Sequence, residues 1–379
     1  MLLEELGFIF HLYLFGLWFA VLYLEWGLGL PLSFVERVFM KQGERHMKLK
    51  TVLCPVDFSK VSSKEIGLAS QICERFAARL VLQHNIDYIP PIYLANAWMY
   101  SETHMAPEEE KEAQAERRLQ ELLAKLPSTL QFEGKITFGR LDESILHLAR
   151  KLPADLIVMG THGASSPEHA SHTDRVLAQA PCPILTIRDE VPESRLPSFK
   201  SAGEPTQLAV MLPMDFSTHS LHALEFAFGL MEDLPVRLHL LHIEGPIAWD
   251  DLGGIAHLNL HEKKQQRLAH SLERLKALIP EDFSARVNCV VRMGSVVEEI
   301  VTYANNIAAS FVIMGAHPKN IFDKLLFGVT SKGVLHQSPC PVWLVPTGKS
   351  SGSVGHWSSI NSEANPIQRT GPGPEHFIG

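Results

Sequence analysis

One stretch of the sequence occurs twice, and this repetition limits the folds that the chain can adopt. The first copy runs from Leu156 to Arg188 and the second from Phe311 to Pro346. Each copy begins with an apolar run that ends in Met-Gly, continues through a polar loop that contains glycine, and then shows apolar residues at helical spacing. A Pro-Cys-Pro ends that helix, and a second apolar run follows. Each copy is therefore predicted to form a strand, a loop, a helix and a second strand.

The loop in each unit has the position and the chemistry of a ligand-binding site. A β-α-β unit places it at the carboxyl end of a parallel strand, where open α/β sheets bind their ligands. The free N–H groups of the loop and of the following helix N-terminus can hold a phosphate. We therefore expect the function of the chain to depend on these two loops.

The repetition extends to two whole domains. Asp57 and Asp215 follow matching apolar strands and are 158 residues apart (215 − 57 = 158). Cys182 and Cys340 have the same spacing (340 − 182 = 158). Further strands and amphipathic helices follow in the same order, including a helix that we expect Asp142 to cap. The alternation predicts an α/β fold of two tandem Rossmann-like domains, each a parallel sheet with helices on both faces.

Composition sets the boundaries of the two domains. The stretch between them is rich in Pro, Ser and Glu, and the tail is rich in Ser, Gly, Asn and Pro without periodicity. We predict a hydrophobic N-terminal segment at 1–46, the first domain at 47–190, a linker at 191–206, the second domain at 207–347 and a disordered tail at 348–379.

Net charge and cysteine use argue against several classes of protein. The formal net charge of −8 disfavours a general nucleic-acid-binding protein, which is expected to show a basic face. The 5 cysteines are odd in number and form no C-x-x-C, so neither a disulfide framework nor a zinc ribbon is indicated. We therefore predict reduced core thiols and a cytoplasmic protein.

The apolar segment from Gly7 to Leu24 allows two interpretations. It carries no charged residue, and its length is at the lower limit of the roughly 17–25 residues that cross a bilayer. Acidic residues before it and basic residues after it would place the C-terminal side in the cytosol, tethered to the inner face of the membrane. Met47 directly precedes the first domain, so the segment can equally be an upstream translation that the working protein lacks.

Motifs that recur in both halves are similar to those of a known family. They are Pro-Val-Asp-Phe-Ser and Pro-Met-Asp-Phe-Ser after the first strands, Gly-Thr-His-Gly and Gly-Ala-His-Pro after the fourth, and Pro-Cys-Pro near each domain end. Over residues 47–188 and 208–347 the chain resembles a tandem universal stress protein. The resemblance implies adenine nucleotide binding, with ATP and Mg²⁺ as the ligands. It also implies that the terminal strands, 183–188 and 341–346, meet in an intramolecular pseudo-dimer of the two domains.

The resemblance assigns Asp57 and Asp215 to the adenine side of two sites. A carboxylate at a strand end can accept a hydrogen bond from the adenine amino group, while glycines let the backbone approach phosphate oxygens. The alternative for both aspartates is a helix N-cap or a turn.

The phosphate pattern of ATP-binding family members, G-x2-G-x9-G-(S/T), is incomplete in the first copy. Gly160 and Gly163 match it, with His162 between them, and alignment on the Pro-Cys-Pro places Ser171 at the hydroxyl position. Only residues 164–169 then lie where the pattern has nine, so the loop is three residues short. The histidines of this loop invite a metal interpretation, which we disfavour because no H-x3-H or cysteine pair supports it.

The second copy keeps the spacing but changes the residue types. Gly315 and Gly328 match the pattern, whereas Pro318 replaces the second glycine and Val329 replaces the hydroxyl residue. Proline has no N–H donor and fixes φ at about −65°, which excludes a glycine-type conformation. Thr330 is the next residue that could supply the hydroxyl.

The sequence favours a binding protein over an enzyme. It contains no G-x-S-x-G, P-loop lysine or H-E-x-x-H motif. We therefore expect a stress-response protein that binds ATP in its first domain and acts on unidentified protein partners, as the pseudo-dimer or as a further homodimer. One alternative is a membrane-tethered interaction module that binds no nucleotide. Another is slow ATP hydrolysis.

Overall fold

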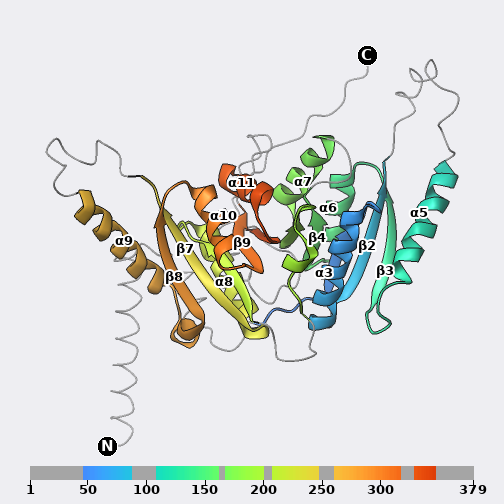
Figure 1. Ribbon diagram of the computed structural model, residues 1–379. Helices are drawn as coiled ribbons and strands as arrows, with labels where there is room; N and C mark the ends of the chain where they lie inside the picture. Colours follow the sequence, from blue (N-terminus) through green and yellow to red (C-terminus); the bar gives the residue numbers. More distant parts are fainter. Residues whose placement is uncertain are drawn as a thin grey trace, which may run out of the picture.

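The fold is that of a computed structural model (Figure 1). The apolar segment Gly7–Leu24 and the predicted tail lie outside the residues that it describes. Within the described part of the chain, no helix combines the length and the apolar character needed to span a membrane. The described residues are 46–87, 108–161, 167–199, 207–246, 260–316 and 328–346.

The first half alternates strands and helices as the apolar pattern predicts. Its first helix begins because the hydroxyl of Ser59 accepts a hydrogen bond from the backbone N–H of Ser62, and it ends at Ala77, which is left-handed. In chain order the elements are β1 (Thr51–Pro55), α3 (Lys60–Phe76), β2 (Arg79–Ile86), α5 (Glu108–Leu123), β3 (Phe132–Phe138), α6 (Leu141–Lys151), β4 (Leu156–Gly160), α7 (Pro167–Gln179) and β5 (Ile184–Ile187).

The second half repeats this order. Its first helix is capped in the same way, by Ser217 accepting from the N–H of Ser220. Two short 3-10 helices, η3 (Glu193–Arg195) and η6 (Glu281–Arg286), lie in the connections. The remaining elements are β6 (Leu208–Pro213), α8 (Thr218–Asp233), β7 (Val236–Glu244), α9 (Leu260–Lys276), β8 (Val287–Met293), α10 (Val296–Asn306), β9 (Phe311–Ala316), α11 (Val329–Gln337) and β10 (Val342–Pro346).

The strands of both halves form one 10-stranded sheet in the order β3-β2-β1-β4-β5-β10-β9-β6-β7-β8. Neighbouring strands are parallel within each half. At the centre β5 and β10 pair antiparallel, with Val342 opposite Thr186 and Leu344 opposite Ile184. This pairing confirms the expected meeting of the terminal strands, and we call it the seam.

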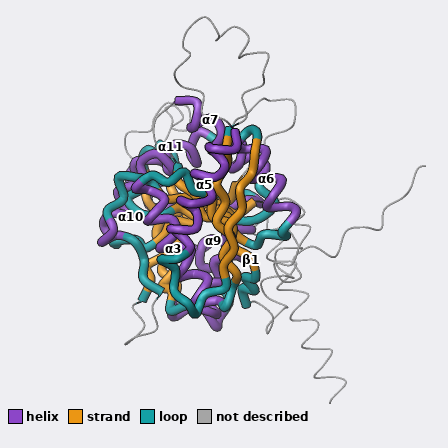
Figure 2. The backbone as a smooth tube through the Cα atoms, turned by 90° about the vertical axis from the view of Figure 1, so that its right-hand side faces the viewer, coloured by secondary structure: helices purple, strands orange, loops and turns teal. Residues whose placement is uncertain are grey.

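Each face of the sheet carries one hydrophobic core that contains residues of both halves. Side chains alternate between the faces, so Val52 and Cys54 enter one core while Leu53 enters the other. Helices α3, α5, α8 and α9 cover the first face, and α6, α7, α10 and α11 cover the second. Figures 1 and 2 show these helices on both sides of the strands. The α/β fold with helices on both faces is therefore as predicted.

Aromatic packing supports the seam. Trp343 of β10 is only 2% exposed. Its ring centroid lies 5.2 Å from that of Phe226 on α8 and 6.1 Å from that of Phe311 on β9. Beside it, the hydroxyl of Thr186 donates to the carbonyl oxygen of Val342 across the seam at 3.2 Å. The central strands are thus held by side chains as well as by backbone pairing.

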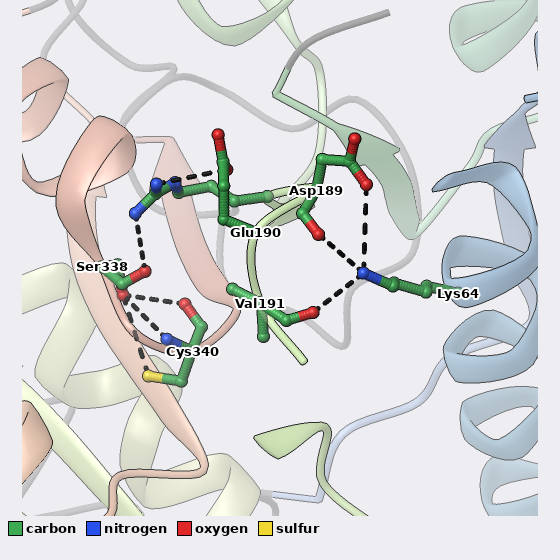
Figure 3. A network of polar contacts seen from close by, with 7 residues as sticks. Lys64, Asp189, Glu190, Val191, Ser338 and Cys340 are labelled. Atoms are coloured by element: carbon green, nitrogen blue, oxygen red, sulfur yellow. Dashed lines mark hydrogen bonds and ion pairs between the residues drawn. The ribbon is translucent and has the colours of Figure 1, made fainter. Parts of the chain in front are cut away.

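The chain that leaves β5 connects the two halves through polar contacts (Figure 3). Arg188 donates to the carbonyl oxygen of Ser338, at the end of α11, at 3.1 Å. On the other side, the ammonium of Lys64 on α3 donates to the carbonyl oxygens of Asp189 (2.6 Å) and Val191 (2.9 Å). The segment that follows the seam is therefore fixed to a helix of each half.

The first part of the predicted linker packs between the halves. Val191 and Phe199 are buried. The N–H of Phe199 donates to the side chain of Gln71 on α3 at 3.1 Å, and its ring lies 5.8 Å from that of Phe311. Residues 200–206 lie outside the described part.

The prediction that Asp142 caps its helix is wrong. Helix α6 begins at Leu141, with Arg140 at the N-cap position and no side-chain capping bond. Asp142 is buried in the first turn, where its carboxylate lies 3.0 Å from Arg140 and 3.7 Å from Arg175 on α7. The carboxylate therefore joins two helices, and its negative charge suits the N-terminal end of α6.

We predict that Trp343→Ala lowers the free energy of unfolding by about 3–5 kcal/mol, because it removes the largest side chain packed at the seam. Val329 provides the control, because it is 88% exposed and lies close to Trp343 in the sequence. The substitution Val329→Ala should change the free energy of unfolding by less than about 0.5 kcal/mol. Urea unfolding followed by circular dichroism measures both. Equal, small effects of the two substitutions would contradict the role given to Trp343.

Candidate functional site

Each half of the sheet has one point where the strand order reverses, and predicted site residues meet there. In the first half β1 lies between β2 and β4, and in the second β6 lies between β7 and β9. Asp57 follows β1 and Gly160 ends β4, so both stand at the carboxyl ends of neighbouring parallel strands. Asp215 and Gly315 hold the same positions on β6 and β9. Ligands of open α/β sheets bind at such points.

The carboxylate of Asp57 is held in place by the turn that leads into α3. It accepts hydrogen bonds from the backbone N–H of Ser59 at 2.9 Å and from the hydroxyl of Ser62 at 2.7 Å. Ser59, not Asp57, caps the helix, so the turn interpretation of this aspartate is the correct one of the two structural alternatives. The residue is nevertheless exposed, and these two bonds hold its carboxylate in one orientation.

Asp215 is held in the same way by the first turn of α8. Its carboxylate accepts from the N–H of Ser217 at 3.0 Å and from the hydroxyls of Ser217 and Ser220, each at 2.6 Å. Partial burial alone would raise the pKa of Asp215, but these hydrogen bonds outweigh it and hold the pKa below its usual value. The group is therefore an ionised carboxylate at neutral pH, and it places a fixed negative charge at the carboxyl end of β6.

Phe58 and Phe216, directly after the two aspartates, adopt a conformation that is rare for a bulky residue. Their φ angles are 60° and 61°, in the left-handed region that favours glycine. Such strain persists only where the surroundings fix it, and it is concentrated at functional sites. Its occurrence at the same place in both halves marks a feature that the sequence did not reveal, because no residue letter reports a φ angle.

Each phenylalanine ring lies close to a histidine ring and to an arginine guanidinium. The Phe58 ring lies 4.1 Å from the ring of His84 and 5.8 Å from the guanidinium of Arg118. In the second half, the Phe216 ring lies 4.9 Å from His242 and only 3.8 Å from the guanidinium of Arg274. The two corners are built alike, but an arginine covers the second ring more closely.

The two histidines are oriented by the strand ends. Nδ1 of His84 lies 2.9 Å from the carbonyl oxygen of Val56, and Nδ1 of His242 lies 2.6 Å from that of Met214. A bond to a carbonyl requires Nδ1 to carry the proton. In a neutral His84 ring this leaves Nε2 as the acceptor, whereas Nε2 of His242 lies 3.4 Å from the carboxylate of Glu244. Burial lowers the pKa of His84, so this ring is neutral at pH 7.

The glycines of the predicted phosphate pattern have different structural roles. A Cβ on Gly315 would lie 2.3 Å from the carbonyl oxygen of His219, so glycine is required there for β9 to pass the first turn of α8. Gly328 is the N-cap of α11 and has nothing within 4 Å of a built Cβ. Thr330 is the second residue of that helix.

The phosphate side of the first site is described only in part. His162 and Gly163 lie outside the described residues. Ser171 is placed only by its backbone, inside α7, which begins at Pro167. Helix α7 thus starts before the predicted Ser171 position, whereas α11 starts at Val329, the matching residue (171 + 158 = 329).

Glu65 is a buried acid beneath the first site that we did not single out from the sequence. It lies on α3, is 5% exposed, and accepts a hydrogen bond from the backbone of Gly160. Burial, together with the negative charges of Asp57 and Asp189, raises its pKa to about 8, although the bond from Gly160 opposes the shift. Glu65 precedes Ala69 by four positions, so helical spacing already placed it on the buried face.

The described residues do not support a metal site. Among them, no group of three or more His, Cys, Asp or Glu side chains is arranged to hold a metal ion. His162 lies outside this part of the chain, as do the side chains of His169 and His172.

The fold and the paired strand ends define a duplicated α/β protein with a candidate ligand site in each half. The model of the universal stress protein family matches residues 48–188 and 209–346, and the chain belongs to this family. A universal stress protein of Thermus aquaticus is 29% identical over 142 residues, which are 37% of this chain and 98% of that protein. Universal stress protein A homolog 1 of Coxiella burnetii is 29% identical over 145 residues, which are 37% of this chain and 97% of that protein.

A solved structure shares the fold over both halves. The crystal structure of a universal stress protein from Archaeoglobus fulgidus matches with a TM-score of 0.55 and 19% identity, covering 81% of this chain and 99% of that one. At this identity the similarity shows the fold alone.

The strained conformation of Phe58 gives a prediction about stability. Glycine tolerates a left-handed backbone and alanine does not, so Phe58→Gly should be more stable than Phe58→Ala by about 1 kcal/mol. Exposed Glu121 within α5 is the control, where the order should reverse and glycine should be less stable by about 1 kcal/mol. Urea unfolding of the four variants tests this, and a lower stability of Phe58→Gly than of Phe58→Ala would contradict the assigned conformation.

The buried Glu65 gives a second prediction. Its pKa is about 8 in the folded chain against a usual 4.5, so the folded state binds this proton more tightly than the unfolded state does. The contribution of Glu65 to stability is therefore complete below pH 4.5 and is lost, by on the order of 1 kcal/mol per pH unit, as the pH rises to about 8. Glu65→Gln should remove this slope in unfolding measurements between pH 5 and pH 8. The exposed Glu74→Gln on the same helix should keep it.

Proposed function

We propose that the chain binds an adenine nucleotide, ATP with Mg²⁺, at the strand ends of its first half. The observation that carries this proposal is the exposed carboxylate of Asp57, fixed by Ser59 and Ser62 at the point where the strand order reverses. A carboxylate in that position accepts a hydrogen bond from the exocyclic amino group of adenine. Gly160, at the end of the neighbouring strand, begins the loop that would carry the phosphates.

Contacts in the second half favour the first half as the nucleotide site. The guanidinium of Arg274 lies 3.8 Å over the Phe216 ring, so this face of the ring is already occupied, whereas Arg118 lies 5.8 Å over the Phe58 ring. In the sequence, Pro318 also removes an N–H donor from the second loop. The second half then serves mainly as the structural partner of the first.

The chemistry of the described side chains supports a binding role rather than catalysis. Four of the thiols, Cys54, Cys73, Cys182 and Cys340, are buried, and burial raises the pKa of each. A buried neutral thiol is a poor nucleophile. We therefore propose that the chain acts without catalysis, by presenting to protein partners a surface that changes when the nucleotide binds.

Calorimetric titration of the full-length chain with ATP and Mg²⁺ tests the nucleotide site. Asp57→Ala should weaken binding by about 10–100-fold, the range expected for a lost hydrogen bond to a charged group. Asp215→Ala should have little effect. Asp282→Asn is the control, because exposed Asp282 lies in η6 before β8, away from the carboxyl ends of the strands.

Two outcomes would contradict the proposal. One is the absence of saturable binding to a folded, nucleotide-free chain. The other is a loss of affinity in Asp57→Ala no greater than in Asp282→Asn. A comparison with GTP tests whether the base faces Asp57. The exocyclic oxygen of guanine would be repelled by the Asp57 carboxylate, whereas the amino group of adenine would donate to it. The preference for ATP over GTP should therefore shrink in Asp57→Ala.

A further inference from the structure

The two halves meet at the seam in an arrangement that is close to a two-fold rotation. Leu185 of β5 lies opposite Trp343 of β10, and the two residues also match each other in the repeat (185 + 158 = 343). A residue at such an axis faces its own counterpart, so in a pair of identical halves it would face an identical residue. The residues near the axis therefore show whether the seam is made for identical or for different halves.

The pair at the centre of the seam joins a large side chain to a smaller one. Trp343 is buried, and its ring packs against Phe226 of α8 and Phe311 of β9. Leu185 is fully buried opposite it, in the same core. Two second halves would place a second indole in the space of the leucine, which overpacks the core, and two first halves would leave the volume of the indole unfilled. The centre of the seam therefore fits one half of each kind.

The helices on the second face carry opposite charges where they meet across the seam. The ammonium of Lys332 on α11 donates to the carboxylate of Asp174 on α7 at 3.0 Å, and the two residues are counterparts in the repeat (174 + 158 = 332). Two first halves would bring two carboxylates together at this contact, and two second halves would bring two ammonium groups together. Both arrangements are repulsive.

A third pair of counterparts meets on the first face. Arg75 lies in the last turn of α3 and Asp233 ends α8, and they match in the repeat (75 + 158 = 233). The guanidinium of Arg75 donates to the backbone carbonyl oxygen of Asp233, which places a cation at the C-terminal end of a helix. The Asp233 carboxylate accepts a hydrogen bond from the N–H of Met47 at 2.6 Å. Two first halves would place two arginines here, and two second halves would place two aspartates.

These pairs act on the choice of partner more than on stability. A single exposed ion pair contributes little to the free energy of unfolding. The choice between partners is different, because a change from different to identical halves replaces an attraction by a repulsion at each charged contact. The steric pair and both charged pairs therefore disfavour the same two pairings, those of identical halves.

We infer that the seam is an interaction surface that accepts a different half and rejects an identical one. The first half therefore fits the second half of its own chain or that of a second copy. Two copies can associate through this surface by exchanging halves, which forms two seams of the native kind, and not by pairing first half with first half. The inference goes beyond the proposed function and does not depend on nucleotide binding.

Two single variants of the full-length chain test the choice of partner. Asp174→Lys places two lysines at the contact between α7 and α11, and Lys332→Asp places two aspartates there. Each chain then repels itself at this contact, but one chain of each variant, with halves exchanged, has opposite charges at both seams. The two variants are unfolded in urea and refolded as an equal mixture, with one of them isotope-labelled. Native mass spectrometry at low salt counts the two-chain species of each composition.

We expect the two-chain species with one copy of each variant to exceed either species with two copies of one variant by about tenfold, against about twofold for random pairing. The excess should shrink when the mixture is refolded at higher salt. Glu116→Lys and Lys264→Asp are the matched control, because both residues are exposed and lie on α5 and α9, at opposite ends of the sheet (Figure 1). Their mixture should show random pairing. An equal excess in the control, or no excess in the test mixture, including the case in which no two-chain species forms, overturns the inference.

Urea unfolding of the separate chains is a second readout that needs no exchange of halves. Each single variant should unfold at a lower urea concentration than the parent. The chain that carries both substitutions should recover most of this loss, because opposite charges again meet across the seam. A double variant that is no more stable than the single variants would overturn the inference.

Discussion

The antiparallel pairing of β5 with β10 is the contact on which the rest of the structure depends. Two neighbouring antiparallel strands are exchanged by a rotation about an axis perpendicular to the sheet, and such a rotation keeps each face on its own side. Helices α3 and α8 therefore cover one face and α6 and α10 the other, and each core continues from one half into the other. Within each half the strands are parallel and need helices on both faces, so the shared cores satisfy this requirement for both halves at once.

The seam also brings together the helices that follow the two candidate loops. Lys332 of α11 lies 3.0 Å from the carboxylate of Asp174 on α7, and Arg188 binds the carbonyl oxygen of Ser338. On the other face, Lys64 connects α3, whose Ser62 binds the Asp57 carboxylate, to the segment after β5. A ligand that moves α7 or α3 in the first half therefore acts on contacts with the second half. This continuity is the physical route that the proposed effect of a nucleotide on the protein surface requires, because packed elements shift as units.

The sequence predicted the features that depend on pattern and spacing. Constant separations between repeated motifs were enough to predict the duplication, and the apolar runs were enough to predict the strands. Prediction from the sequence failed where contacts between distant segments determine the position of a side chain. Asp142 looked like a helix cap, but an arginine from α7 draws its carboxylate into an ion pair. The left-handed Phe58 and the arginines over the two rings depend on packing between segments far apart in the chain, which no local pattern reports. Glu65 was visible on a buried helical face, yet only the fold shows that the strand end of Gly160 lies above it.

Duplication gives this chain two strand ends of the same design and allows them to differ. Burying an acid costs free energy unless a hydrogen bond compensates it. Glu65 in the first half is compensated by Gly160, and its charged form is opposed by Asp57 and Asp189, so what it adds is a stability that depends on pH. The second half keeps the capping serines and the fixed carboxylate, but an arginine closes over its aromatic ring. The two halves thus share a scaffold while their strand ends have different electrostatics.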